Sequence, residues 1–358
     1  MADVKVDLDS LGYLSGSYRG LSDTVSNAKT YQGTYINLNA SGQVSGVSTA
    51  VLILAKKVED ALTTWLSDTE KATSGAADCL DGCARSYQEN ERVSVELFDG
   101  HYTPADVAPA RSGASSTAPG KLTAPAAQTT FATVFNALGM VGNSVSPSYW
   151  LGTAADAVLD LILGQGEHDP FAAIGNTIAG DWEAFSVASD ALSKMSDYFK
   201  ELGTDTKNYW GNVDPDWDGG ASDAASEALG KMGTSFDDAS GRLSTISNSY
   251  NAVAVGVYNT ADSLAGVLRI AADMGIAAVA SAAAGTATFA TVVGPIAGYV
   301  AAGVAVIRML RAIRQVFDIL GKVWTCVEAF TGLCSMTLGL AHGSGGPLTI
   351  YNPNFSEQ

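Results

Sequence analysis

Apolar residues near the start of the chain recur every three or four positions, the spacing of one face of an α-helix. This stripe includes Leu11, Leu14, Tyr18, Leu21 and Val25. Turn-forming residues interrupt it at 37–42, and the same spacing resumes from 44 to 83. Residues 1–99 are therefore predicted to form two long antiparallel helices. The apolar stripe of such a hairpin cannot be buried within the hairpin, so it requires a packing partner.

A second stretch with the same period lies in the C-terminal half. One apolar stripe covers 185–209, a returning stripe covers 232–257, and Gly, Asp and Pro dominate the turn at 211–220. Shorter helical patterns precede it, and we assign 128–272 to one unit. The predicted fold class is all-α, with two long antiparallel helical hairpins packed into one bundle.

The composition changes between and after these hairpins. Residues 100–127 are rich in Pro, Ala, Ser and Gly, a composition that predicts a flexible, partly extended linker. Residues 273–342 are rich in Ala and Gly, and they predict a hydrophobic helical hairpin with a break at Gly294-Pro295. The remaining tail, 343–358, is expected to be turn-like.

No charged residue occurs at 274–307, a stretch of 34 residues that is long enough for one membrane-spanning helix. The arginines that follow it, Arg308, Arg311 and Arg314, would suit a membrane surface. However, Ala and Gly are only weakly apolar on transfer scales, and small residues also permit close packing between helices. We favour helices packed inside the protein or between subunits, with membrane contact as the alternative.

Overall composition and charge exclude several classes of protein. Hydrophobic residues make up 47% of the chain and charged residues 16%, which excludes a wholly disordered chain. A net charge of −17 would repel nucleic acid, so no nucleic-acid partner is expected. The first twelve residues lack the basic, apolar and small-residue segments of a secretory signal peptide. Any export is therefore expected to follow a route that does not depend on a cleaved signal peptide.

The sequence contains no recognisable catalytic motif. Its three histidines, His101, His168 and His342, fall in the linker, a turn and the tail, and no zincin, phosphate-loop or serine-hydrolase motif occurs. We therefore predict neither enzymatic activity nor a cofactor.

Two weaker patterns suggest a metal site and a disulfide. Asp214, Asp216 and Asp218, followed by Gly219, match the start of a calcium-binding loop, but the twelfth position, which needs a bidentate acid, is Ala225. A solvated acidic turn that caps the next helix is the favoured interpretation. The possible disulfide joins Cys326 and Cys334, and it requires the helix to break at Gly332. Cys79 and Cys83, spaced four apart, are interpreted as small apolar residues in a helix seam.

The turn of the second hairpin carries a Trp-x-Gly sequence, Trp217-Asp218-Gly219, and an Ala-rich helical stretch follows it. Glycine permits a tight turn there, and tryptophan supplies a large apolar anchor. This arrangement resembles the WxG helical-hairpin proteins that type VII (ESX-like) secretion systems export, in particular those of actinobacteria.

That family also carries a Tyr-x-x-x-Asp/Glu signal just past the second helix of a hairpin. Here the pattern occurs at Tyr87–Glu91 and at Tyr258–Asp262, each at the expected end of a hairpin. A spacing of four places the phenol and the carboxylate on one helix face, where a receptor can contact both.

The first hairpin lacks a Trp-x-Gly turn and resembles the partner-type hairpins of this secretion class. The whole chain is thus similar to a fused, PE/PPE-like arrangement in which both partners lie on one polypeptide. If the hairpins pack antiparallel, Trp217 should lie near Tyr87 and Glu91 and form one composite signal with them.

The resemblance implies a protein that is cytoplasmic before export, is exported folded and is then secreted or held at the cell surface. Its implied partner is the secretion ATPase and translocon, and self-association is expected after export. Outside the cell it would act as a structural, oligomer-forming virulence or cell-surface factor. The alternative is a membrane-inserting or pore-forming protein that uses residues 274–307.

Overall fold

The computed structural model describes residues 6–38, 47–98, 112–127, 182–287 and 293–339. Within these ranges it contains five α-helices, two short 3-10 helices and no strand, so the all-α prediction is confirmed. The α-helices are α1 (Leu8–Tyr35), α2 (Val47–Phe98), α6 (Trp182–Gly211), α7 (Gly220–Ala287) and α8 (Val293–Thr337). The short helices expected within 128–181 and the tail at 343–358 lie outside the described residues.

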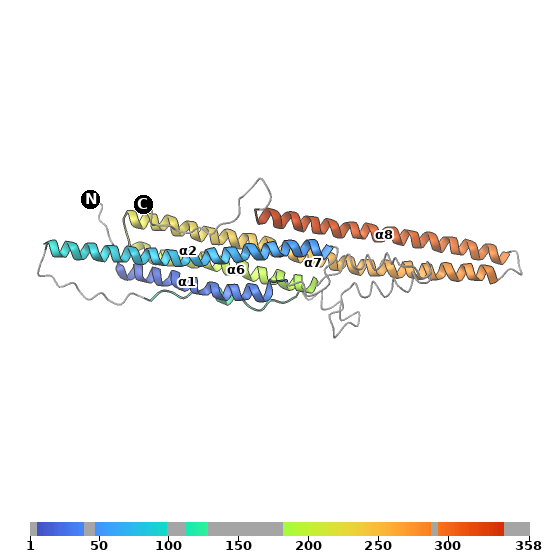
Figure 1. The fold of residues 1–358 in the computed structure, drawn as a ribbon, viewed down its shortest axis with the longest axis horizontal. Coiled ribbons are helices and arrows are strands. Elements are labelled where there is room, and N and C mark those ends of the chain that lie inside the picture. Colours follow the sequence, from blue (N-terminus) through green and yellow to red (C-terminus); the bar gives the residue numbers. More distant parts are fainter. Residues whose placement is uncertain (1–5, 39–46, 99–111, 128–181, 288–292, 340–358) are drawn as a thin grey trace.

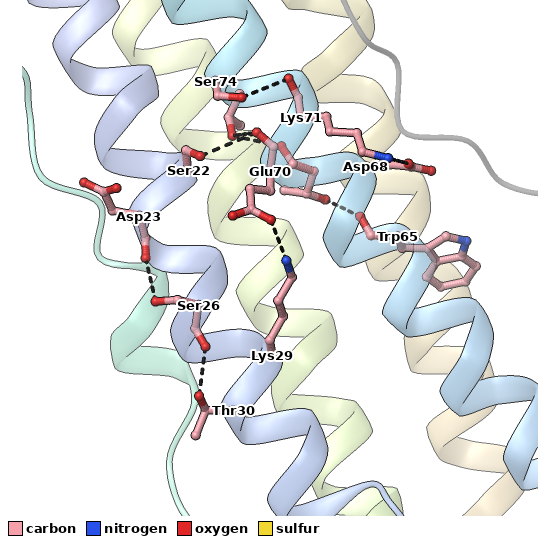
Figure 2. Close-up of polar contacts among 12 residues, drawn as sticks. Ser22, Asp23, Ser26, Lys29, Thr30, Trp65, Asp68, Glu70, Lys71 and Ser74 are labelled. Carbon is pink, nitrogen blue, oxygen red and sulfur yellow. Dashed lines mark hydrogen bonds and ion pairs between the residues drawn. The ribbon is translucent and has the colours of Figure 1, made fainter.

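Helices α1, α2, α6 and the first half of α7 lie side by side in an elongated bundle (Figure 1). The buried side chains of each helix repeat every three or four residues, as the sequence predicts. Polar contacts outside this core fix the register of α1 against α2. Lys29 pairs with Glu70 (Figure 2), and Arg19 pairs with Asp78 and Asp81.

Small residues bring α6 and α7 unusually close together. The hydroxyl of Ser196 donates to the carbonyl of Ser240 over 2.8 Å, and Ser189 and Ser247 donate to each other's carbonyls in the same way. At Gly203 a Cβ atom would lie only 3.1 Å from the carbonyl oxygen of Gly233. Serine and glycine at these positions let the two backbones approach while every buried hydroxyl named here keeps a partner.

Helix α7 does not end where the second hairpin was expected to end. It is 68 residues long and continues without a break through 272–273, where the second hairpin was separated from the hydrophobic region, to Ala287. Helix α8 folds back along its second half, and the two form a third hairpin that projects past the bundle (Figure 1). Tyr250 and Phe330 pack with ring centroids 5.3 Å apart, and Arg242 donates to the carbonyl of Thr337. Packing along α8 stabilises α7 through its own glycines, which disfavour helix.

The break expected at Gly294-Pro295 is also displaced, because both residues lie inside the first turn of α8. Proline is tolerated there because the first four amide groups of a helix have no partner within it. The further break required at Gly332 does not occur either. Cys326 and Cys334 are free thiols on one continuous helix. Eight residues of helix separate them by about 12 Å, whereas a disulfide needs Cα atoms within about 7 Å. The possible disulfide is therefore ruled out in this fold.

Residues 112–127, which we call the strap, are not a flexible linker but pack along the bundle against α1 and α6. Ser116 donates to Asp205 and Thr117 to Glu201, each over 2.6 Å, while the side chain of Ala118 is completely buried. Burial raises the pKa of Asp205, and the hydrogen bond from Ser116 partly offsets that rise. The small residues that suggested a flexible linker are those that allow the strap to pack closely against α1 and α6.

The closest approach of the strap is at Gly113, where a Cβ atom would lie 2.2 Å from the carbonyl carbon of Gly16. Both neighbours are backbone and cannot rotate away, so Gly113→Ala must push the strap off α1. We expect a loss of about 1–3 kcal/mol in the free energy of unfolding, together with faster proteolysis of the strap.

The matched control is Gly120→Ala, also in the strap, where nothing lies within 4 Å of the added methyl group. It should change stability by less than about 0.5 kcal/mol. Urea denaturation followed by circular dichroism, with limited proteolysis, measures both variants. Equal effects of the two substitutions would show that the strap does not pack on α1 as described.

Candidate recognition site at the tip of the bundle

One end of the bundle, which we call the tip, brings together three segments distant in the sequence. They are the turn between α6 and α7, the N-terminal end of α1 and the C-terminal part of α2. Three of the predicted signal residues, Trp217, Gly219 and Tyr87, lie here.

The turn itself explains the Trp-x-Gly sequence. A short 3-10 helix, Asp214–Asp216, follows α6, and Gly219 then adopts a φ of 114°, a backbone conformation that side chains disfavour. The chain enters α7 immediately afterwards. The carbonyl of Gly219 accepts from the amide of Asp223, and the carbonyl of Trp217 accepts from the hydroxyl of Ser222. The predicted requirement for glycine at this turn is thus confirmed.

Trp217 lies in the core and is only 2% exposed. Its ring centroid is 6.0 Å from that of Trp210, and its indole N–H donates to the Tyr87 hydroxyl over 3.4 Å. This hydrogen bond is long, so burial of the indole accounts for most of its contribution. The expected proximity of Trp217 to Tyr87 is confirmed, and it joins residues 130 positions apart in the sequence.

The N-terminal end of α1 is a third part of the tip, and the sequence analysis did not find it. Val6 forms an isolated antiparallel bridge with Trp217, and the amide of Asp7 donates to the carbonyl of Asp216 over 3.0 Å. The Ser10 hydroxyl lies 3.0 Å from the Asp216 carboxylate and donates to it. The Asp7 N-cap was recognisable in the sequence, but its link to a turn more than 200 residues later was not.

The exposed part of the tip is the end of α2. This helix extends past the turn between α6 and α7 (Figure 1). Glu91, which follows Tyr87 by one helical turn toward the end of α2, has an exposed side chain. Glu89 and Arg92 form an ion pair in the same part of α2, and its hydrogen bonds hold the pKa of Glu89 below its ordinary value. A projecting helix end with exposed carboxylates offers a partner a surface to bind.

The second Tyr-x-x-x-acid sequence does not occupy an equivalent place. Tyr258 is buried in the middle of α7, which runs on to Ala287, so the expectation that this motif closes a hairpin is wrong. The side chain of Asp262 lies outside the described set. Only the motif at Tyr87 meets the Trp-x-Gly turn.

The acidic turn is used for folding contacts. Asp216 accepts hydrogen bonds from α1, and Ala225, where a calcium loop needs its bidentate acid, is buried in α7. Throughout the described ranges, no group of three or more His, Cys, Asp or Glu residues could hold a metal ion. The calcium hypothesis for Asp214, Asp216 and Asp218 therefore gains no support from this geometry.

Comparisons with protein-family models, with curated proteins and with solved structures found no match to this chain. The resemblance to type VII substrates consequently rests on the residues of the tip and on the helical-hairpin architecture.

Because Trp217 is buried, we expect tip variants to differ widely in their free energy of unfolding. Trp217→Ala should lower the free energy of unfolding by about 3–5 kcal/mol, because a large buried ring is lost. Tyr87→Phe and Ser10→Ala each remove one hydrogen bond and should cost about 0.5–1.5 kcal/mol. Chemical denaturation monitored by tryptophan fluorescence measures all three. A Trp217→Ala protein as stable as the Tyr87→Phe protein would contradict the burial described here.

Proposed function

We propose that this chain is a type VII secretion substrate that is exported folded and carries its export signal at the tip. The single observation that carries the proposal is the contact between Trp217 and Tyr87. It brings the Trp-x-Gly sequence of one hairpin and the Tyr-x-x-x-Glu sequence of the other to one place. If the two motifs had occurred by chance, there would be no reason for them to lie in contact in the folded chain.

The burial of Trp217 assigns different roles to the two motifs. A side chain that is 2% exposed offers almost no surface to a receptor, so we propose that Trp217 orients the end of α2. The residue that a secretion ATPase would contact is Glu91, which is exposed on the projecting helix. Recognition then depends on a folded tip, which is consistent with export in the folded state.

After export, we propose a structural role without catalysis. The strap joins α1 of the first hairpin to α6 of the second, so both hairpins travel as one folded unit. As to the alternative of membrane insertion by residues 274–307, no helix in the described part of the chain has the length and apolarity to cross a membrane.

The export signal is tested by substituting the exposed acid without disturbing the core. Glu91→Ala should reduce the amount of protein in the culture medium by at least about tenfold, while its unfolding transition stays unchanged because Glu91 makes no buried contact. The measurement is immunoblotting of medium and cell pellet from producing cells, with a cytoplasmic protein as the lysis marker.

The matched control is Glu89→Ala, which removes a carboxylate from the same helical turn but a different face. Its ion pair with Arg92 is exposed and contributes at most about 1 kcal/mol, so the fold should persist. Normal export of Glu89→Ala with retention of Glu91→Ala supports the proposal. Normal export of both variants, or export that persists in cells lacking the secretion ATPase, would overturn it.

A further inference from the structure

The outer surface of α8 is unusually apolar for an exposed helix. Nine of the thirteen exposed large hydrophobic residues in the described chain lie on α8, and Ile307, Leu310, Phe317 and Trp324 are each 44–63% exposed. Contacts with α7 do not account for them, because a separate row faces α7. That buried row includes Val316, Val323, Val327 and Phe330. The exposed residues thus form a second apolar surface that the other described parts of the chain leave accessible.

This surface is also basic, in contrast to the rest of the protein. Helix α8 carries four basic residues and two acidic ones in a chain with a net charge of −17. Arg308, Arg311 and Arg314 are exposed, and none of the ion pairs in the described ranges engages them. A partner with negative charge would therefore be favoured at this helix and disfavoured elsewhere on the molecule.

The order of residues along the helix distinguishes between two kinds of partner. Ile307, Leu310, Arg314, Phe317 and Trp324 follow one another at helical spacing and share one face, so a guanidinium lies in the middle of the apolar row. A partner helix packed on this row would have to cover the guanidinium of Arg314, which is costly unless a carboxylate, such as that of Asp318 four residues on, is buried with it. At a phospholipid surface the same guanidinium reaches headgroup phosphates while the apolar side chains enter the acyl boundary.

We propose that this face of α8, comprising Ile307, Leu310, Arg311, Arg314, Phe317 and Trp324, binds the surface of an anionic phospholipid bilayer. The helix lies in the plane of the interface, with Arg311 and Arg314 at the phosphates. Trp324 suits this environment because its ring is apolar and its N–H can bond at the headgroup level. The surface is remote from the tip, so the proposal does not depend on the export signal.

The position of α8 makes such contact sterically possible. The hairpin formed by α7 and α8 projects past the four-helix part of the bundle (Figure 1); among the described helices α8 packs mainly on α7 and makes fewer contacts with α2. Asp318 and Glu328 on α8 and Asp273 on α7 are exposed acids of this hairpin, but the four basic residues of α8 outnumber its two acids. Acidic residues of the four-helix part act less strongly, because salt screens exposed charges beyond about 8 Å under physiological conditions. Their repulsion from an anionic surface therefore does not cancel the attraction of the nearby arginines.

Flotation of the full chain with lipid vesicles tests this inference. We expect binding to vesicles of phosphatidylcholine mixed with phosphatidylglycerol, weak binding to phosphatidylcholine alone, and a marked decrease as salt is raised. Because each basic residue near an anionic surface contributes about 1 kcal/mol, Arg311→Glu with Arg314→Glu should weaken binding by at least about tenfold. Phe317→Ser with Trp324→Ser should weaken it similarly on the same vesicles.

Two controls match these variants in the number of charges reversed and of apolar side chains removed. Lys57→Glu with Lys200→Glu reverses two exposed charges on the four-helix part, and Val93→Ser with Leu97→Ser removes two apolar side chains, 41% and 75% exposed, at the C-terminal end of α2. Both should bind vesicles like the unsubstituted protein, and circular dichroism should show all variants folded.

Equal binding by the α8 variants and the controls, or no binding of the unsubstituted protein to anionic vesicles, would overturn the proposal. So would a finding that the α8 substitutions change the molecular mass in solution, measured by light scattering, without affecting vesicle binding. That last result would assign the face to a protein interface.

Discussion

The arrangement of this molecule depends on the apolar stripe that each helical hairpin exposes when it stands alone. The hairpin of α1 and α2 covers its stripe by packing α1 against α6. At that interface Tyr209 packs edge-on against both Tyr13 and Tyr18, with ring centroids 6.5 and 6.2 Å away, and the Thr24 hydroxyl hydrogen-bonds to Tyr198. These contacts set the register between the hairpins, and that register is what places the end of α2 beside the turn between α6 and α7.

The helices of this fold were predictable because their apolar period is long and regular, and because two of the main turns are rich in turn-forming residues. The strap was not predictable by the same reasoning. Its composition correctly indicates that it has no core of its own, but not that its hydroxyl groups meet Asp205 and Glu201 on α6. Whether a polar, small-residue segment packs depends on a groove formed by residues remote in the sequence, and composition contains no information about that groove.

The end of the second hairpin was mispredicted for a related physical reason. The Tyr258–Asp262 motif and the change to an Ala- and Gly-rich composition placed the end of the hairpin near 272, and each glycine disfavours helix by roughly 1 kcal/mol. Packing against α8 more than offsets that cost, and the same packing buries Tyr258. At Gly256 a Cβ atom would lie 3.3 Å from the Cys326 sulfur, so small residues there serve the contact between α7 and α8.

The tip shows how a motif can identify a site without being the surface that a partner contacts. Trp217 and Gly219 are recognisable in the sequence because a tight turn and a buried anchor restrict the residues allowed there. Those restrictions come from folding, whereas Glu91, which is exposed, faces few of them. Under the proposed function, a receptor that binds Glu91 would depend on Trp217 indirectly, because the indole contacts Tyr87 and so helps to hold the end of α2. Recognition of this kind would couple the proposed export to folding, because a chain whose hairpins have not packed presents the acid but not the geometry around it.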